Sequence, residues 1–198
     1  MNNLNPKSLF IISGPSGAGE DSVIDGLKKY FLIERVITTT TRQMRPGERQ
    51  GHPYYFISKK DFQKKIKENQ FFEWAEEYGR YYGVSREEIE RVKNSGKIGV
   101  WKIAYKGVIT AKKLMPDILA ILISAPLDIL EKRIRLRNPE YSDDFIKERI
   151  DYTKEWLKNK DIYDYEVINE QGKLDETVKK TAEIIKKHLN VDKALFLL

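Results

Sequence analysis

The feature that most constrains the fold is a short apolar run that leads directly into a glycine-rich turn. Residues 9–13 (LFIIS) predict a buried strand, and residues 14–22 (GPSGAGEDS) follow it. Gly14 and Gly19 occupy both glycine positions of the phosphate-binding pattern G-x-x-x-x-G-K-[ST]. In such a loop, backbone N–H groups and the start of the next helix bind phosphate oxygens. We therefore expect the loop at the carboxyl end of a strand in a parallel sheet.

The loop departs from that pattern in its charge. Glu20 and Asp21 stand where the pattern has Lys and Ser or Thr. At an effective dielectric constant of about 20, one charge pair at about 4 Å is worth roughly 4 kcal/mol, so the reversal disfavours a phosphate ligand. The alternative is that both carboxylates cap a helix over residues 21–30. The candidate phosphate-loop residues are Gly14, Ser16, Gly17, Gly19, Glu20, Asp21 and Ser22.

The rest of the chain alternates apolar runs with amphipathic stretches. Further buried strands are expected at 99–104, 118–124 and 166–169, and helices at 21–30, 60–68, 85–95, 127–137, 142–159 and 173–189. This alternation predicts an α/β fold, a parallel sheet with helices on both faces. Residues 35–83 predict an inserted, mainly antiparallel lobe, and the arginine-rich segment 134–146 predicts a lid.

Composition narrows the class of protein. The 198 residues carry a net charge of +6 and no cysteine, which excludes disulfides and thiolate metal sites. No apolar run approaches about 18 residues, so we expect a cytoplasmic protein with no membrane partner. The lysine-rich stretches 59–67 and 179–187 are interpreted as solvated helix faces, and no nucleic-acid-binding motif accompanies them. The apolar tail 191–198 is expected to dock on the core.

Several motifs in a fixed order resemble guanylate kinases. They are GPSGAG at 14–19, TTRQMRPGE at 40–48 with Gly51 and Tyr54, FFEWAEEYGRYYG at 71–83, the arginines 133, 137 and 149, and VIN at 167–169. The resemblance implies a P-loop NTPase-like sheet, an inserted monophosphate-binding lobe and a small lid that close over ATP·Mg²⁺ and GMP. It divides one domain into a core (1–34, 96–132 and 150–198), a lobe (35–95) and a lid (133–149).

The same resemblance implies roles for individual residues. The GMP-binding set is Thr38, Arg42, Arg45, Tyr54, Glu73 and Tyr82, and the arginines that meet the transferring phosphates are Arg133, Arg137 and Arg149. Three positions depart from the family pattern. Val84 replaces a hydroxyl residue after YYG, and Lys102 and Ala104 replace two aspartates. We therefore expect a relaxed or altered base preference, because a polar base is discriminated by paired hydrogen bonds.

Two of these departures suggest one exchange of charge. Glu20 replaces a lysine and Lys102 replaces an aspartate, on neighbouring parts of the family fold. We hypothesise a Glu20–Lys102 ion pair, in which Lys102 supplies the catalytic ammonium and Asp21 or Glu20 binds Mg²⁺. The alternative is a degraded site that accumulated unrelated changes.

Three functions stay open from the sequence. The first is an ATP-dependent guanylate kinase acting on GMP as a monomer or homodimer. The second is an inactive guanylate kinase-like module that binds a phosphorylated ligand or phosphopeptide through Arg42, Arg45, Tyr54 and Tyr82. The third is a sensor that binds nucleotide without turnover.

Overall fold

A parallel five-stranded sheet forms the centre of the computed structural model, which describes residues 8–77 and 79–189. The strand order is β2-β7-β1-β8-β9, and every neighbouring pair is parallel. The strands are β1 (Leu9–Ser13), β2 (Ile33–Arg35), β7 (Ile98–Trp101), β8 (Leu119–Ser124) and β9 (Tyr165–Ile168). The predicted α/β fold class is confirmed.

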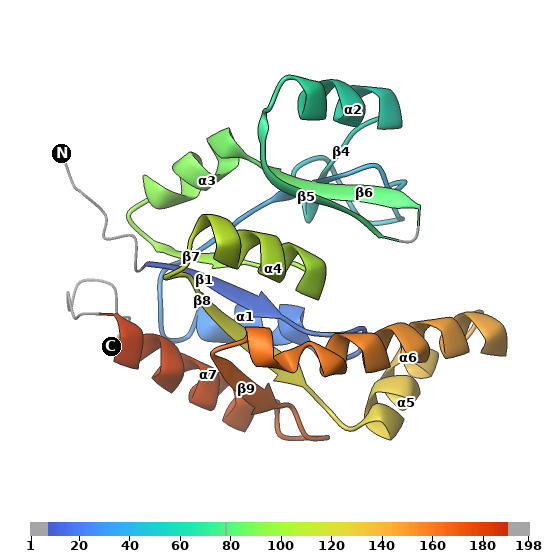
Figure 1. Ribbon diagram of the computed structural model, residues 1–198. Helices are drawn as coiled ribbons and strands as arrows, with labels where there is room; N and C mark the ends of the chain where they lie inside the picture. The colour runs from blue at the N-terminus through green and yellow to red at the C-terminus, as the bar shows by residue number, and fades with distance from the viewer. Residues whose placement is uncertain (1–7, 78, 190–198) are drawn as a thin grey trace.

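Alternate side chains of β1 enter two separate cores. Phe10 and Ile12 pack into one apolar cluster, and Leu9 and Ile11 pack into another on the opposite face. Successive strand residues point to opposite faces, so a continuous apolar run fits a strand that is covered on both sides. The first face is covered by α1 (Glu20–Leu27) and α7 (Leu174–His188), the second by α3 (Arg86–Lys93), α4 (Tyr105–Leu114) and α6 (Asp143–Lys158) (Figure 1).

The inserted lobe is a small mixed sheet that lies above the second face (Figure 1). Its strands are β3 (Thr38–Thr40), β4 (Tyr54–Phe56), β5 (Phe71–Glu77) and β6 (Arg80–Ser85), with α2 (Lys59–Lys67) against them. The strand order is β4-β3-β6-β5, in which β3 pairs parallel with β4 and the other two pairs are antiparallel. The lobe is therefore mainly antiparallel, as expected.

Two elements of the central layers were missed by the sequence prediction. The strand β2 joins the central sheet at residues for which no strand was expected. Helix α3 lies where a helix was expected, and it packs Ile89 and Val92 into the core of the central sheet. Helix α4 was missed because Gly107 and the β-branched run 108–110 lower its helix propensity. The exact division into core, lobe and lid stays a prediction.

The predicted lid lies between two helices at the carboxyl ends of the sheet strands (Figure 1). Helix α5 (Leu127–Arg137) ends before residues 138–142, and Ser142 then caps α6 by accepting a hydrogen bond from the Phe145 backbone N–H. The short 3-10 helix η2 (Lys160–Ile162) follows. No helix among the described residues is long and apolar enough to cross a membrane. The tail 191–198 lies outside the described residues.

Candidate active site

The loop between β1 and α1 has the geometry of an anion-binding turn. Gly19 has a φ of 91° and is the N-cap of α1, with no side chain capping that helix. A Cβ at Gly19 would lie 2.7 Å from Asn169 Nδ2, so a side chain there would clash as well as strain the backbone. The first N–H groups of α1 are thus left without a side-chain acceptor at their N-cap, which suits a bound phosphate.

Two side chains donate hydrogen bonds to backbone carbonyl oxygens of the loop. Asn169, after β9, donates from Nδ2 to the Ala18 carbonyl oxygen at 2.8 Å. Arg133 of α5 donates to the Gly17 carbonyl oxygen at 3.2 Å and to the Asn169 carbonyl oxygen at 3.0 Å. Arg133 thus donates to one loop carbonyl oxygen and to one carbonyl oxygen after β9, and it is not among the residues that line the cavity.

Two cations from neighbouring strands contact the loop carboxylate Asp21. Lys102, which follows β7, donates to Asp21 Oδ2 at 2.7 Å, and Arg35 also donates to Asp21. The sequence hypothesis paired Lys102 with Glu20, so the reach of Lys102 to the loop is as predicted but its partner is the next residue. Both carboxylates lie in the first turn of α1, which follows β1, the parallel neighbour of β7.

These contacts shift the ionisation of the loop groups. Burial alone would raise the pKa of Asp21, but Lys102 and Arg35 outweigh it and hold that pKa below its ordinary value. Burial alone would lower the pKa of Lys102, but nearby Tyr54 and the two loop carboxylates outweigh it and raise the pKa to about 12. Burial raises the pKa of Glu20, although Lys102 acts in the opposite direction. Lys102 therefore stays a cation at neutral pH.

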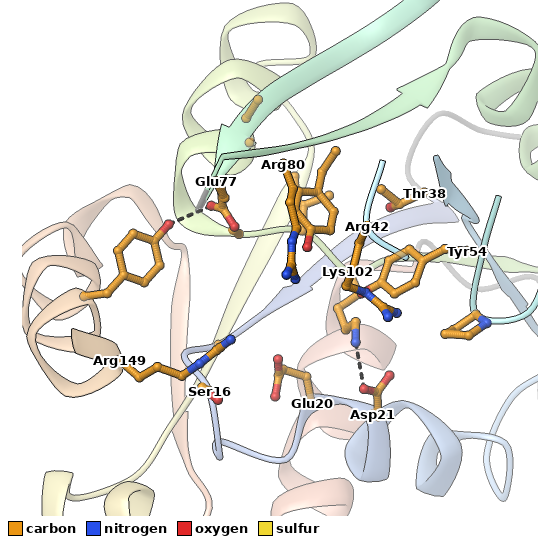
Figure 2. A pocket seen from close by; sticks show the side chains of 18 of the residues that line it. Ser16, Glu20, Asp21, Thr38, Arg42, Tyr54, Glu77, Arg80, Lys102 and Arg149 are labelled. Atoms are coloured by element: carbon orange, nitrogen blue, oxygen red, sulfur yellow. Dashed lines mark hydrogen bonds and ion pairs between the residues drawn. The ribbon is translucent and has the colours of Figure 1, made fainter. Parts of the chain in front are cut away.

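One cavity of about 1270 Å³ lies between the lobe, the loop and α6. Figure 2 shows its labelled side chains converging from above and below: Thr38, Arg42, Tyr54, Glu77 and Arg80 on the lobe side, Ser16, Glu20 and Asp21 on the loop side. The predicted site residues that line it are Gly14, Ser16, Gly17, Glu20, Asp21, Thr38, Arg42, Arg45, Tyr54, Glu73, Tyr82, Lys102, Arg137 and Arg149. Gly19, Ser22 and Arg133 lie outside this lining.

The lobe contributes a guanidinium held in a fixed position. Arg42 is 7% exposed and donates to Glu48 Oε1 at 2.6 Å and to the Gln43 carbonyl oxygen at 2.8 Å. Its guanidinium carbon also lies 5.3 Å from the ring centre of Tyr54. Glu48 also accepts from the Arg45 backbone N–H at 2.8 Å, so one carboxylate bonds the Arg42 side chain and the backbone at Arg45. The hydrogen bond from Arg42 lowers the pKa of Glu48.

Glu73 is a buried carboxyl group in the lining of the cavity. It is 5% exposed, and a Cβ at Gly107 would lie 3.0 Å from Glu73 Oε1, so the first turn of α4 approaches this carboxyl closely. Burial, with a smaller effect from the charge of Glu77, raises the pKa of Glu73 to about 7. Ala104 also lines the cavity and caps α4 without a side-chain hydrogen bond. Glu73 is therefore a buried carboxyl group of the lobe beside the first turn of α4, and Ala104 adds no hydrogen-bonding group there.

Comparison with known proteins decides the family. The sequence model of the guanylate kinase family matches residues 6–188. The chain belongs to the guanylate kinase family. A guanylate kinase of Bartonella henselae is 40% identical over 163 residues, which cover 82% of this chain and 73% of that protein. A guanylate kinase of Buchnera aphidicola subsp. Schizaphis graminum is 41% identical over 166 residues, which cover 82% of this chain and 80% of that protein.

A solved structure agrees on the fold. The crystal structure of guanylate kinase from Anaplasma phagocytophilum is similar with a TM-score of 0.72 and 23% sequence identity. The match covers 93% of this chain and 87% of that chain. The resemblance inferred from the motifs is therefore confirmed for the family, and this family member carries Glu20 where the loop pattern has lysine.

Two arginines of the lid region reach the cavity of this guanylate kinase family member. Arg137, the last residue of α5, donates from one terminal nitrogen to Ser16 Oγ at 3.2 Å. Arg149 of α6 lines the cavity with its guanidinium carbon 4.9 Å from the ring centre of Phe145. Both cations thus lie on the loop side, facing the lobe.

Sequence reasoning missed several cavity residues that stand inside the motifs it quoted. Glu48 closes TTRQMRPGE, and Glu77 and Arg80 belong to FFEWAEEYGRYYG. Tyr152 of α6 donates to Glu77 Oε1 at 2.6 Å, which joins the lobe to the lid-side helix. Strand alternation was the available signal, because Arg80 and Tyr82 share one face of β6.

Proposed function

We propose that the protein transfers the γ-phosphoryl group of ATP to GMP. Membership of the guanylate kinase family supports this activity, and so do relatives of that name at about 40% identity. The observation that carries the proposal is a single cavity with phosphate-binding groups on both sides. Arg42 and Arg45 face it from the lobe, and the loop, Arg137 and Arg149 face it from the core and lid side.

The lobe is proposed to hold the acceptor. Arg42, Arg45, Tyr54 and Tyr82 would surround the GMP phosphate with two guanidinium groups and two phenolic donors. Glu73 would accept hydrogen bonds from the guanine ring, with Thr38 beside it. These assignments rest on the family motifs and on the shared lining of the cavity.

The loop is proposed to hold the donor. Its N–H groups would bind the ATP phosphates, while Arg137, Arg149 and Lys102 neutralise charge on the transferring group. A phosphate oxygen of GMP attacks the γ-phosphorus, the bond from that phosphorus to the bridging oxygen breaks, and ADP and GDP result. No protein nucleophile takes part, so the chain's contribution is positioning and charge stabilisation. Arg133 would be a positioning residue that acts through the Gly17 and Asn169 carbonyl oxygens.

Mg²⁺ is proposed to accompany ATP. The described residues hold no group of three or more His, Cys, Asp or Glu side chains that would form a metal site alone. The two carboxylates of the loop, Glu20 and Asp21, fit Mg²⁺, because this ion is bound through substrate phosphates, waters and one or two carboxylates. Glu20 or Asp21 would hold it, and the ion would neutralise phosphate charge. A cytoplasmic location, a monomeric or homodimeric state and the lack of a nucleic-acid partner stay predictions.

Coupled detection of ADP tests the proposal. The purified protein is assayed with ATP·Mg²⁺ and GMP, dGMP, AMP, UMP or CMP as acceptor, and we expect turnover with GMP. Arg45→Gln should raise KM for GMP at least about tenfold, since a charge-assisted contact is lost. Lys64→Gln, an exposed change on α2 outside the cavity, is the matched control. No turnover with any acceptor, together with measurable binding of GMP or a phosphopeptide, would indicate the inactive module instead.

A further inference from the structure

Arg80 is a cavity residue for which the family motifs assign no role. It is the first residue of β6 and pairs in register with Glu77 across the β5–β6 hairpin. Arg80 and Tyr82 are two residues apart on one strand, so both point to the same face, about 6–7 Å apart along it. Both line the cavity, and Figure 2 shows Arg80 directed from the lobe into it, toward the side where Glu20 lies.

The other cations around the cavity are mostly engaged by protein groups. Lys102 is salt-bridged to Asp21, Arg42 to Glu48, and Arg137 donates to Ser16. By contrast, the Arg80 guanidinium has no hydrogen-bond or salt-bridge partner within the described part of the chain. Arg45 shares this property, but its place in the turn after β3 assigns it to the acceptor phosphate.

The Arg80 guanidinium is exposed and directed into the cavity with no salt-bridge partner among the described residues, so it can contact an anion that binds there. Glu20 lies on the opposite side, where the loop pattern has a lysine. A phosphoryl group placed between the loop and the lobe would meet a carboxylate on its loop side and Arg80 on its lobe side. The positive charge of Arg80 on the lobe is thus placed to offset the negative charge of Glu20 on the loop.

We propose that Arg80 contacts the transferring phosphoryl group and supplies, from the acceptor lobe, the positive charge that the loop lost at position 20. This role rests on the proposed transfer from ATP to GMP. Since the charge acts on the transferring group, it should affect kcat more than KM for GMP. Arg80 is then a catalytic residue delivered by the lobe that binds the acceptor.

Steady-state kinetics of single and double variants test this role. Arg80→Gln should lower kcat at least about 100-fold and leave KM for GMP within about threefold. Arg80→Lys should be intermediate, because lysine keeps the charge without the planar fork. Arg86→Gln, which removes a guanidinium from the start of α3, next to the lobe and outside the cavity, is the matched control and should keep wild-type kcat. Thermal unfolding of each variant checks that the fold is intact.

A double variant separates charge compensation from a merely structural role. Glu20→Lys should restore the kcat of Arg80→Gln by a larger factor than it changes the kcat of the wild type. Three results would overturn the role of Arg80. Glu20→Lys could change kcat by the same factor in Arg80→Gln and in the wild type, Arg80→Gln could keep the wild-type kcat, or its loss could be confined to KM for GMP. In those cases the wild-type enzyme still phosphorylates GMP. If the wild type itself showed no turnover, the proposed function would fail, and this role with it.

Discussion

Lys102 and Asp21 form a salt bridge of 2.7 Å between the end of β7 and the first turn of α1. The two residues are 81 positions apart in sequence, but β7 and β1 are parallel neighbours, so the segments after them meet at one edge of the sheet. The pair brings an ammonium beside a loop whose own lysine is replaced by Glu20. The net charge around the loop therefore depends on the residues after β1 and on Lys102 after β7.

The first prediction concerns this ammonium. Lys102→Ala should lower kcat/KM for ATP about 10- to 100-fold, because Asp21 and Glu20 would then face the phosphates with less compensation. Coupled ADP detection at several ATP concentrations measures the effect. Lys113→Ala, an exposed lysine of α4 outside the cavity, should leave kcat/KM for ATP unchanged. Unaltered turnover in Lys102→Ala would favour the alternative that the loop changes are unrelated.

The second prediction concerns Glu73 and pH. Its carboxyl must be ionised to accept two hydrogen bonds from guanine, and its pKa is about 7. KM for GMP should therefore rise as the pH falls from 8 to 6, as protonation removes one acceptor. The profile is measured at saturating ATP, and a KM for GMP that is flat across this range would contradict the prediction.

The same pKa has a consequence for stability. The pKa of Glu73 in the folded state lies above the ordinary value of 4.5, so the folded state binds this proton more tightly than the unfolded state. The stability that proton binding provides is therefore lost as the pH rises from about 4.5 to 7. Glu73→Gln should then raise the free energy of unfolding by about 2–3 kcal/mol at pH 8 and by less at pH 5. Urea unfolding at both pH values measures the difference. Glu76→Gln, a change at an exposed neighbour on β5, is the matched control.

The sequence predicted the elements whose patterns are unambiguous. β1 and α5 have the predicted bounds, because an unbroken apolar run and a clear amphipathic period mark them. α4 was missed, since its burial against the sheet overrides the poor helix propensity of Gly107 and its β-branched neighbours. β2 was missed because its three residues, Ile-Glu-Arg, carry too little pattern to mark a strand.

The site divides in a similar way. Motifs predicted which residues line the cavity, including Glu73 and Tyr82, because their spacing fixes their positions on strands. They did not predict hydrogen-bond partners. Lys102 bonds Asp21 rather than Glu20, and Arg133 bonds the Gly17 and Asn169 carbonyl oxygens, because these choices depend on side-chain geometry across distant segments. Charge complementarity in a sequence indicates that two regions meet but not which atoms do.

The third prediction concerns base preference. Ala104 lines the cavity at the N-cap of α4, where the family pattern has an aspartate. Ala104→Asp should raise the ratio of kcat/KM for GMP to that for AMP at least about tenfold, because a carboxylate adds an acceptor for the guanine amino group. Ala104→Ser is the matched control: it also caps α4 but adds no charge, and should leave the ratio nearly unchanged. Equal ratios in all three proteins would show that residue 104 does not contact the base.

The fourth prediction concerns the Asn169 side chain, which donates to the loop backbone. Asn169 is 5% exposed, donates to the Ala18 carbonyl oxygen at 2.8 Å and accepts from Thr177 Oγ1 at 3.2 Å. Asn169→Asp keeps the shape but turns the donor into an acceptor, so two oxygens would oppose each other at a buried position. We expect a loss of unfolding free energy of at least about 1–3 kcal/mol.

The loosened loop should also bind donor less well. KM for ATP should rise in Asn169→Asp while KM for GMP stays near the wild-type value, because Asn169 contacts the loop and not the lobe. Asn159→Asp is the matched control, since Asn159 Nδ2 also donates to a backbone carbonyl oxygen, that of Glu155, at 2.8 Å but in a solvated position. If both variants lost the same stability, or if KM for GMP rose as much as KM for ATP, the buried contact would not be what orders the loop.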